Sequence, residues 1–328
     1  MSFNRRFLKG IKCLFKTRIP KILSAFILLY FVFSVLFKKR NFDMSTTVNV
    51  ENEIRDGNVN ANTSKDNRHH IVLGILSRQQ NGHYRITQRE TWIYAMLRLQ
   101  NVLPFIITYK FLLDKPSSES IKENYLHQDI VYLNVSYHGL ADKFGEKMYV
   151  WWRYIHKIYP YALMGARIDD DVFVCVPQLF ERLDSLKSTT LYYGWRHGKR
   201  KQIDRDNRID DMFLVLGKDL ISLISKKTYC GERTCKNKDD LIETGQGGTS
   251  MAEWLSVYND NINFVHFVAD NDRIVQLGDN QSDSHNKSLK PNFCDNKLVF
   301  HKSTCEIMHQ LHVYNDHLNN SRNIEPLF

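Results

Sequence analysis

Short apolar runs alternate with stretches of helical period along most of the chain. Residues 71–76 are an apolar run of strand length, and in residues 84–99 apolar side chains recur near the helical spacing. These two patterns predict strands at 71–76, 102–109, 130–134, 162–168, 172–176, 191–195, 212–216, 264–268, 273–276 and 297–301, and helices at 84–99, 117–127, 143–158, 178–186, 218–226 and 251–258. Such alternation is typical of an α/β layer with a mostly parallel sheet, which binds ligands beyond the carboxyl ends of its strands.

The N-terminal segment differs from the rest of the chain in charge and hydropathy. Residues 22–37 form an uncharged apolar run that would span roughly 24 Å as a helix, with Lys21 and Lys38 at its ends. A cleaved signal peptide is the rival interpretation, but basic residues follow the run where a cleavage site needs small ones. Seven basic residues precede the run and three follow it, so we expect the N-terminus to face the cytosol.

Together these features predict four parts of the chain. They are a cytoplasmic tail at 1–21, a transmembrane signal-anchor at 22–37, a flexible stem at 38–68 and a lumenal domain at 69–328. A short anchor suits the thin membranes of the early secretory route, and we expect a single-pass type II protein of the Golgi membrane. Five glycosylation sequons lie beyond the run, in agreement with a lumenal domain: Asn62, Asn134, Asn280, Asn286 and Asn319.

Net charge gives no sign of a nucleic-acid partner. The chain carries a formal charge of +9, and its first forty residues hold ten basic residues and no acidic one, so the remainder carries +9 − 10 = −1. A nearly neutral folded part lacks the basic surface that binding to a phosphate backbone requires.

Five cysteines lie beyond the apolar run, so at least one of them has no partner within the domain. Cys175 lies in an apolar run and is predicted to be a free thiol packed in the core. Local disulfides are plausible for Cys230 with Cys235 and for Cys294 with Cys305, although the sequence leaves the pairing open. Neither spacing is that of a zinc motif.

The acidic triplet Asp169-Asp170-Asp171 is the clearest candidate site. It stands between two apolar runs that read as buried strands, so its charges are fixed at one edge of the sheet. The alternative is a solvated acidic turn. Three neighbouring carboxylates favour a hard divalent cation such as Mn²⁺ or Mg²⁺, which could itself hold a diphosphate.

A glycine-rich turn precedes the predicted helix at 251–258. Thr249 or Ser250 would serve as its N-cap, and the free N–H groups at the helix start could hold an anion. The turn lacks the lysine of a P-loop, so alone it is weak evidence for a phosphate site.

Two motifs resemble those of one enzyme family. The segment Arg85-Ile-Thr-Gln-Arg-Glu-Thr-Trp92 is similar to the pattern R-x-x-I-R-x-T-W, and Lys147, Pro160 and the run Asp169–Val174 recur at matching intervals. Both patterns are typical of the β-1,3-galactosyltransferase-like glycosyltransferases, which include N-acetylglucosaminyltransferases and Fringe. The resemblance implies a GT-A fold with a Rossmann-like, mostly parallel sheet. It also implies a UDP-sugar donor, a glycan acceptor on protein or lipid, a divalent cation, usually Mn²⁺, and an inverting transfer that forms a β-1,3 linkage.

The resemblance also assigns roles to individual residues. Asp171 and His301 would bind the metal, whereas Asp169 and Asp170 would face the nucleotide or a metal-bound water. Arg85, Arg89 and Lys147 would lie at the donor site. For the two arginines an equally good interpretation is that they pair with carboxylates on a helix face, Glu90 among them. Trp92 is expected in the core.

The catalytic base is where the chain departs from the family. Where the family has an Asp at the start of a helix, this chain has glycine in the stretch Gly247–Ala252. Glu243 is the leading candidate for the base, and Asp211 is the second. Gln88 and the pair Asp210-Asp211 are further departures, which suggest an altered acceptor pocket. A non-catalytic lumenal chaperone or binding protein is therefore the main alternative function, and a phosphatase-type hydrolase is less favoured because its further motifs are missing.

Overall fold

The computed structural model describes residues 67–135, 144–200, 202–231, 240–242, 247–262, 264–277 and 293–321. The chain divides into two compact units, Met1–Lys65 and Asp66–Phe328, and all described residues belong to the second. The predicted tail, membrane anchor and nearly all of the predicted stem therefore lie outside the described residues. Within the ranges that are described, no helix is both long enough and apolar enough to cross a membrane.

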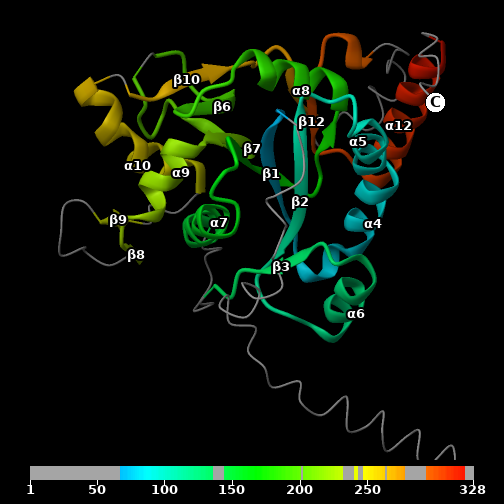
Figure 1. Ribbon diagram of the computed structural model, residues 1–328, viewed down its shortest axis with the longest axis horizontal. Coiled ribbons are helices and arrows are strands. Elements are labelled where there is room, and N and C mark those ends of the chain that lie inside the picture. The colour runs from blue at the N-terminus through cyan, green and yellow to red at the C-terminus, as the bar shows by residue number, and fades with distance from the viewer. Residues whose placement is uncertain are drawn as a thin grey trace, which may run out of the picture. The chain divides into compact units, whose positions relative to one another are not determined.

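A seven-stranded sheet forms the centre of the molecule (Figure 1). Its strands, in spatial order, are β10 (His266–Ala269), β6 (Leu191–Arg196), β7 (Ile209–Gly217), β4 (Met164–Asp169), β1 (His69–Leu76), β2 (Phe105–Leu113) and β3 (Ile130–Tyr132). All neighbouring strands are parallel except β7, which is antiparallel to both β4 and β6. The predicted α/β architecture with a mostly parallel sheet is confirmed.

A smaller sheet continues from the end of β4. It consists of β5 (Phe173–Val174), β12 (Val299–His301) and β11 (Ile274–Gln276), with β12 parallel to β11 and antiparallel to β5. A separate parallel pair joins β8 (Tyr229–Gly231) to β9 (Leu241–Ile242). Because Asp170 to Val172 connect β4 directly to β5, the acidic triplet lies at the junction of the two larger sheets.

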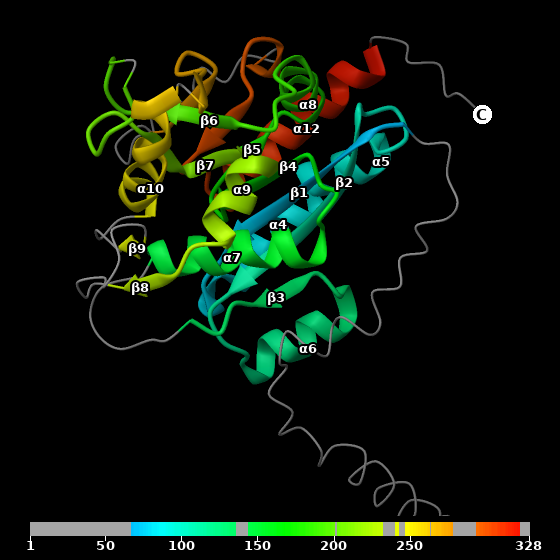
Figure 2. The same cartoon turned by 60° about the vertical axis from the view of Figure 1, so that its left-hand side comes forward.

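Helices cover both faces of the central sheet (Figures 1 and 2). One face packs against α5 (Trp92–Leu99), α8 (Val176–Ser185) and α12 (Cys305–Ser321), with α4 (Gly82–Glu90) beside them. The other face packs against α7 (Phe144–Ile158), α9 (Lys218–Ser225) and α10 (Gly247–Ile262). Helix α6 (Ser118–His127) precedes β3, and short 3₁₀ turns occupy Gln79–Asn81 and Phe293–Asp295.

The alternation of side chains along the strands divides the core into two layers. In β1, Ile71, Leu73 and Ile75 belong to one buried cluster and Val72 to the other. Gly74 of β1 allows close packing of α7, because a Cβ atom there would lie 2.4 Å from Cε2 of Trp151. Trp151 and Trp152 of α7 are accordingly fully buried in the core.

Several predicted boundaries differ from the structure. The predicted helix at 84–99 is two helices, because the backbone leaves helical geometry at Thr91. The predicted strand at 172–176 is shorter, because Pro177 lies in the first turn of α8, where its fixed φ favours a helix start. Thr249 and Ser250 lie inside α10 rather than at its N-cap, because the helix already begins at Gly247. The pattern also gave no prediction for α12.

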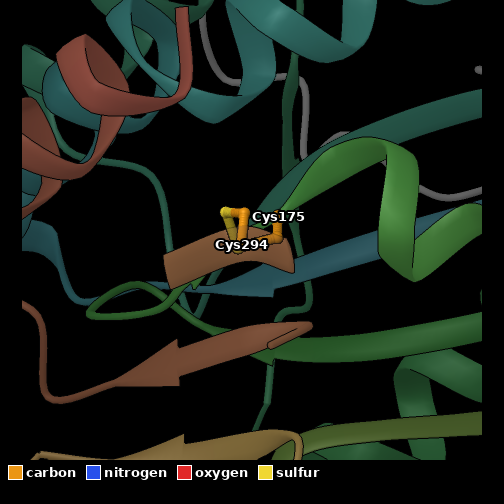
Figure 3. Close-up of a disulfide and its surroundings, with 2 residues drawn as sticks. All are labelled: Cys175 and Cys294. Atoms are coloured by element: carbon orange, nitrogen blue, oxygen red, sulfur yellow. A yellow bond between two sulfur atoms is a disulfide. The ribbon is translucent and has the colours of Figure 1, made fainter. Parts of the chain in front are cut away.

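The structure corrects the prediction for Cys175 and the pairing of Cys294 with Cys305. Cys175 is not free but forms a disulfide with Cys294, at a Cα–Cα distance of 5.5 Å (Figure 3). The pairing of β5 with β12 explains the bond, because it places the backbone N–H of Cys175 2.9 Å from the carbonyl of Leu298, close to Cys294. Cys305 is free. Cys230 is disulfide-bonded, and Cys235 lies outside the described residues.

Candidate active site

Polar residues from three neighbouring strands meet at one edge of the central sheet. Ser77 follows β1, Asp169 ends β4, and Asp210 and Asp211 lie near the start of β7. Because β7 is antiparallel to β4, its beginning lies beside the end of β4, where Ile168 pairs with Phe213. This is the edge at which parallel sheets bind ligands.

Asp169, Asp171 and His301 form a group that could hold a metal ion. One ligand atom from each residue lies within 4.8 Å of the others. Nε2 of His301 lies 3.3 Å from Oδ1 of Asp171 and 3.7 Å from Oδ2 of Asp169. Among the described residues, Oδ1 of Asp171 and Nδ1 of His301 are buried without a hydrogen-bond partner. Two carboxylates and an imidazole suit Mn²⁺ or a similar divalent cation, and the buried unpaired oxygen is the kind of atom that a cation would satisfy.

Electrostatics at this group favour proton uptake when no cation is bound. Burial raises the pKa of Asp169 to about 7, and the charges of Asp211 and Asp171 add to this effect, whereas the Arg167 guanidinium opposes it. Nη2 of Arg167, a buried residue of β4, lies 2.7 Å from Oδ1 of Asp169. Burial lowers the pKa of His301, but its interaction with Asp171 and the charge of Asp169 raise that pKa above its ordinary value overall.

Asp170, in the middle of the triplet, has different partners. Its Oδ2 accepts hydrogen bonds from Oγ of Ser77 at 2.7 Å and from Nδ2 of Asn81 at 2.9 Å. Burial raises the pKa of Asp170, although these two hydrogen bonds oppose the rise. The structure therefore divides the triplet: Asp169 and Asp171 lie at His301, and Asp170 is bound to residues that follow β1.

The backbone of the triplet is also held in place. Nε2 of Gln88, a fully buried residue of α4, donates to the carbonyls of Asp170 at 2.7 Å and Val172 at 3.3 Å. The N–H of Ser303 donates to the carbonyl of Asp171 at 2.8 Å. Gln88 thus contacts the acidic triplet itself.

Arg85 and Arg89 pair with carboxylates inside the protein. Arg85, which is 2% exposed, donates from Nε and Nη2 to Glu123 of α6, and Arg89 donates to both Glu123 and Asp129. The pairing partners are Glu123 of α6 and Asp129, which directly precedes β3, and do not include Glu90. Trp92 is 1% exposed and lies in the core.

Lys147 and Asp211 lie at the same edge of the sheet. Nζ of Lys147, in α7, lies 3.0 Å from Oδ2 of Asp114, which follows β2. Asp211 lies against the start of α10, since a Cβ atom on Gly247 would be 3.1 Å from its Oδ2. Glu243, the leading candidate for the base, lies outside the described residues.

Sequence reasoning did not single out three residues that contact the site. Ser77 and Asn81 bind Asp170, and Arg167 binds Asp169. An arginine inside the apolar run 162–168 is a signal that could have been recognised, because a buried cation needs a nearby anion. A fourth residue, His197, lies with Nε2 2.5 Å from Oδ2 of Asp210.

Comparisons with known proteins give only distant likenesses. No family profile matches the chain. No curated protein matches it. Solved structures do align with it, among them the following three. Mouse xyloside xylosyltransferase 1 gives a TM-score of 0.38 at 11% identity over 71% of this chain and 97% of that one. A glycosyltransferase involved in the glycosylation of the major capsid of PBCV-1 gives a TM-score of 0.35 at 10% identity, over 76% of this chain and 99% of that one. The bifunctional glycosyltransferase WbbM gives a TM-score of 0.39 at 13% identity, over 80% of this chain and 51% of that one. At TM-scores this low the likenesses carry no argument about the function of this chain.

Proposed function

We propose that the chain is a metal-dependent glycosyltransferase of the GT-A type. It transfers galactose or an N-acetylhexosamine from a UDP-sugar to a glycan acceptor, with inversion and a β-1,3 linkage. The observation that carries the proposal is the group formed by Asp169, Asp171 and His301 at the carboxyl end of β4. The likeness of residues 85–92 and 169–174 to the β-1,3-galactosyltransferase-like motifs supports the finer assignment.

The three residues would hold the divalent cation through two carboxylate oxygens and the imidazole Nε2. When bound, such a cation neutralises charge on the diphosphate leaving group. Asp171 and His301 would supply a ligand atom each, and Asp169 would supply a second carboxylate. Arg167 pairs with Asp169, and its charge offsets the negative charge of the carboxylates while no cation is bound. Lys147 pairs with Asp114 at the same edge of the sheet and would add positive charge there.

An inverting transfer also needs a base that removes the proton from the acceptor hydroxyl. Two carboxylates remain candidates, Asp211 and Glu243. Asp211 has a specific observation in its favour: its carboxylate lies where α10 begins, and a Cβ atom on Gly247 would come within 3.1 Å of its Oδ2. The family motif has its aspartate in this stretch. Asp211 would thus supply from β7 the carboxylate that this chain lacks at the start of α10.

The chain would work as a type II protein of the Golgi membrane. In this proposal residues 22–37 anchor it, and the domain from residue 69 onward faces the lumen, where glycan acceptors on proteins and lipids occur. UDP-sugar donor and acceptor would meet at the sheet edge that carries the triplet.

A UDP-release assay with a panel of UDP-sugars tests the enzyme proposal. We expect turnover with at least one donor in the presence of Mn²⁺ and an acceptor, and loss of turnover on addition of a chelator. Asp171→Asn should abolish both turnover and Mn²⁺ binding, whereas Asp211→Asn should reduce turnover and leave Mn²⁺ binding unchanged. If no donor is turned over although Mn²⁺ and UDP bind, the alternative of a non-catalytic lumenal chaperone or binding protein is favoured. The glycine at position 247, where the family motif has its aspartate, is also consistent with that alternative.

A further inference from the structure

Asp170 is held by a buried chain of contacts that leads away from the proposed metal. Its Oδ2 accepts a hydrogen bond from Oγ of Ser77 at 2.7 Å. The same hydroxyl oxygen accepts a hydrogen bond from Nη1 of Arg85 at 3.0 Å. The Ser77 hydroxyl has a single O–H group, which donates to Asp170, so Arg85 donates to a lone pair on the Ser77 oxygen. The cationic donor polarises the hydroxyl and strengthens its hydrogen bond to Asp170.

Arg85 is itself fixed by α6. Nε and Nη2 bind both oxygens of Glu123, at distances of 2.7 to 3.1 Å, and Nη1 also donates to the carbonyl of Arg78 at 2.7 Å. This bidentate geometry defines the plane of the guanidinium. Glu123 also accepts from Arg89 at 2.7 Å. With its nitrogens engaged in this way and its side chain 2% exposed, Arg85 has little capacity left for a donor phosphate.

The backbone contacts act in the same direction. Gln88 binds the carbonyls of Asp170 and Val172, on either side of Asp171, and Ser303 binds the carbonyl of Asp171. Helix α4 therefore contributes both the side chain that orients Ser77 and the side chain that holds the triplet backbone.

We propose that Asp170 is a positioning residue, which Ser77 and Asn81 anchor with the support of Arg85 and Glu123, so that Asp169 and Asp171 face His301. It works as a hydrogen-bond acceptor, and its charge contacts neither the cation nor the donor. The inference rests on the proposed metal site and refines it, because it assigns the middle carboxylate and Arg85 to the support of the site rather than to the ligand.

The amide analogue of Asp170 separates the two roles. Asparagine keeps an oxygen that can accept from Ser77 and Asn81 but removes the charge, whereas alanine removes both. If Asp170 positions the triplet, Asp170→Asn should retain Mn²⁺ affinity and Asp170→Ala should lose it. Ser77 offers a second, independent pair: Ser77→Thr keeps the hydroxyl and Ser77→Ala removes it.

Mn²⁺ alone is the probe, measured by the decrease of the free-ion electron paramagnetic resonance signal on titration into the full chain. We expect dissociation constants within about threefold of wild type for Asp170→Asn and Ser77→Thr. Ser77→Ala and Asp170→Ala should bind at least tenfold more weakly, as expected when an outer contact of a metal ligand is lost. A loss for Asp170→Asn as large as that for Asp171→Asn would overturn the proposal, and so would wild-type affinity in Ser77→Ala.

Hydrogen exchange of the Ser303 amide provides a readout that does not depend on metal. This amide reports on the triplet because it is bonded to the Asp171 carbonyl. Its protection should persist in Asp170→Asn and decrease in Ser77→Ala and Asp170→Ala. If wild-type protein binds no Mn²⁺, the proposed function fails, and the anchoring role is still decided by exchange: unchanged protection in all variants refutes it.

Discussion

Nε2 of His301 lies 3.3 Å from Oδ1 of Asp171, although the two residues belong to distant parts of the sequence. Backbone pairing brings them together, because β12, which ends at His301, pairs with β5, which begins two residues after Asp171. The histidine is therefore delivered by a strand end, and its imidazole is fixed relative to the carboxylates before any ligand binds. A preformed site of this kind requires little rearrangement on binding.

Replacing His301 should greatly weaken metal binding. In His301→Ala we expect the Mn²⁺ dissociation constant to rise about 100-fold, because loss of a direct ligand should cost at least as much as loss of an outer contact. Isothermal titration calorimetry with Mn²⁺ measures the effect. His309→Ala is the matched control, since His309 lies on the exposed side of α12 with its side chain 49% exposed. Equal affinities in His301→Ala and the control would remove His301 from the site.

Metal affinity should depend on pH in a defined direction. Burial raises the pKa of Asp169 to about 7, and the neighbouring carboxylates raise that of His301, so as the pH falls below 7 a cation must increasingly displace protons from this group. Each pH unit below 7 should therefore weaken Mn²⁺ binding about tenfold, because the cation must displace the proton of Asp169. Calorimetric titrations between pH 5.5 and 8 measure this slope. Asp169→Asn should bind more weakly but with a shallower slope, and affinity that does not vary with pH would contradict the assignment.

The same pKa has a consequence for stability. Because the folded-state pKa of Asp169 is raised, its protonated form stabilises the metal-free protein at low pH, and this contribution is lost as the pH rises through about 7. Saturating Mn²⁺ should consequently raise the melting temperature more at pH 8 than at pH 6, as differential scanning fluorimetry can measure. A larger rise at pH 6 would be inconsistent with a protonated Asp169.

Removing Glu123 should destabilise the fold. Glu123 is the shared partner of Arg85 and Arg89, whose side chains are 2% and 11% exposed. Glu123→Ala removes the carboxylate partner of the buried Arg85 and leaves Arg89 with Asp129 alone, and we expect a loss of about 3–5 kcal/mol in the free energy of unfolding. Urea denaturation monitored by circular dichroism measures it. Glu119→Ala, at an exposed position of the same helix, is the control and should change the free energy of unfolding far less than Glu123→Ala does.

The pH dependence of this contribution also has a predictable sign. The pKa of Glu123 lies below its ordinary value: burial would raise it, but the hydrogen bonds from Arg85 and Arg89 lower it by more. The stabilisation is therefore complete above the ordinary glutamate pKa and is lost as the pH falls through the lower folded-state pKa. Wild type and Glu123→Ala should become more similar in stability under strongly acidic conditions.

Local patterns were sufficient to predict much of the sheet and the place of the triplet. Residues 71–76 and 297–301 were predicted as strands because their apolar runs are short and bounded by polar residues. Helix α12 escaped prediction because few of its described side chains are fully buried; Met308 and Leu311 are the clear cases, and polar residues separate them. A stripe this narrow gives only a weak helical period.

Long-range partners could not be predicted from the same patterns. Arg85 and Arg89 have the residue types of an anion site, but whether they bind a ligand or a carboxylate depends on where α6 places Glu123. For the cysteines, sequence proximity favoured Cys294 with Cys305, whereas the β5–β12 pairing determines the bond between Cys175 and Cys294. The two cases have one cause: contacts between distant segments follow from topology, which a local period does not contain.

The disulfide should contribute to both stability and metal binding. It links residues 119 positions apart, so it restricts a long loop of the unfolded chain, and chain-entropy arguments give about 5 kcal/mol for such a loop. Cys294→Ser should lower the free energy of unfolding by roughly this amount. Because the bond ties the start of α8 to the segment that precedes β12, the variant should also hold His301 less firmly and bind Mn²⁺ more weakly.

The free thiol provides the control for this last prediction. Cys305→Ser removes a sulfur from the first turn of α12 without breaking a bond, so its stability should stay within about 1 kcal/mol of wild type. Treatment of wild type with a reductant should reproduce the effect of Cys294→Ser and leave that variant almost unchanged. If Cys294→Ser were as stable as Cys305→Ser, the Cys175–Cys294 bond would contribute nothing to the fold. If the variant lost stability but kept full Mn²⁺ affinity, the position of His301 would depend on the pairing of β12 with β5 and β11 alone.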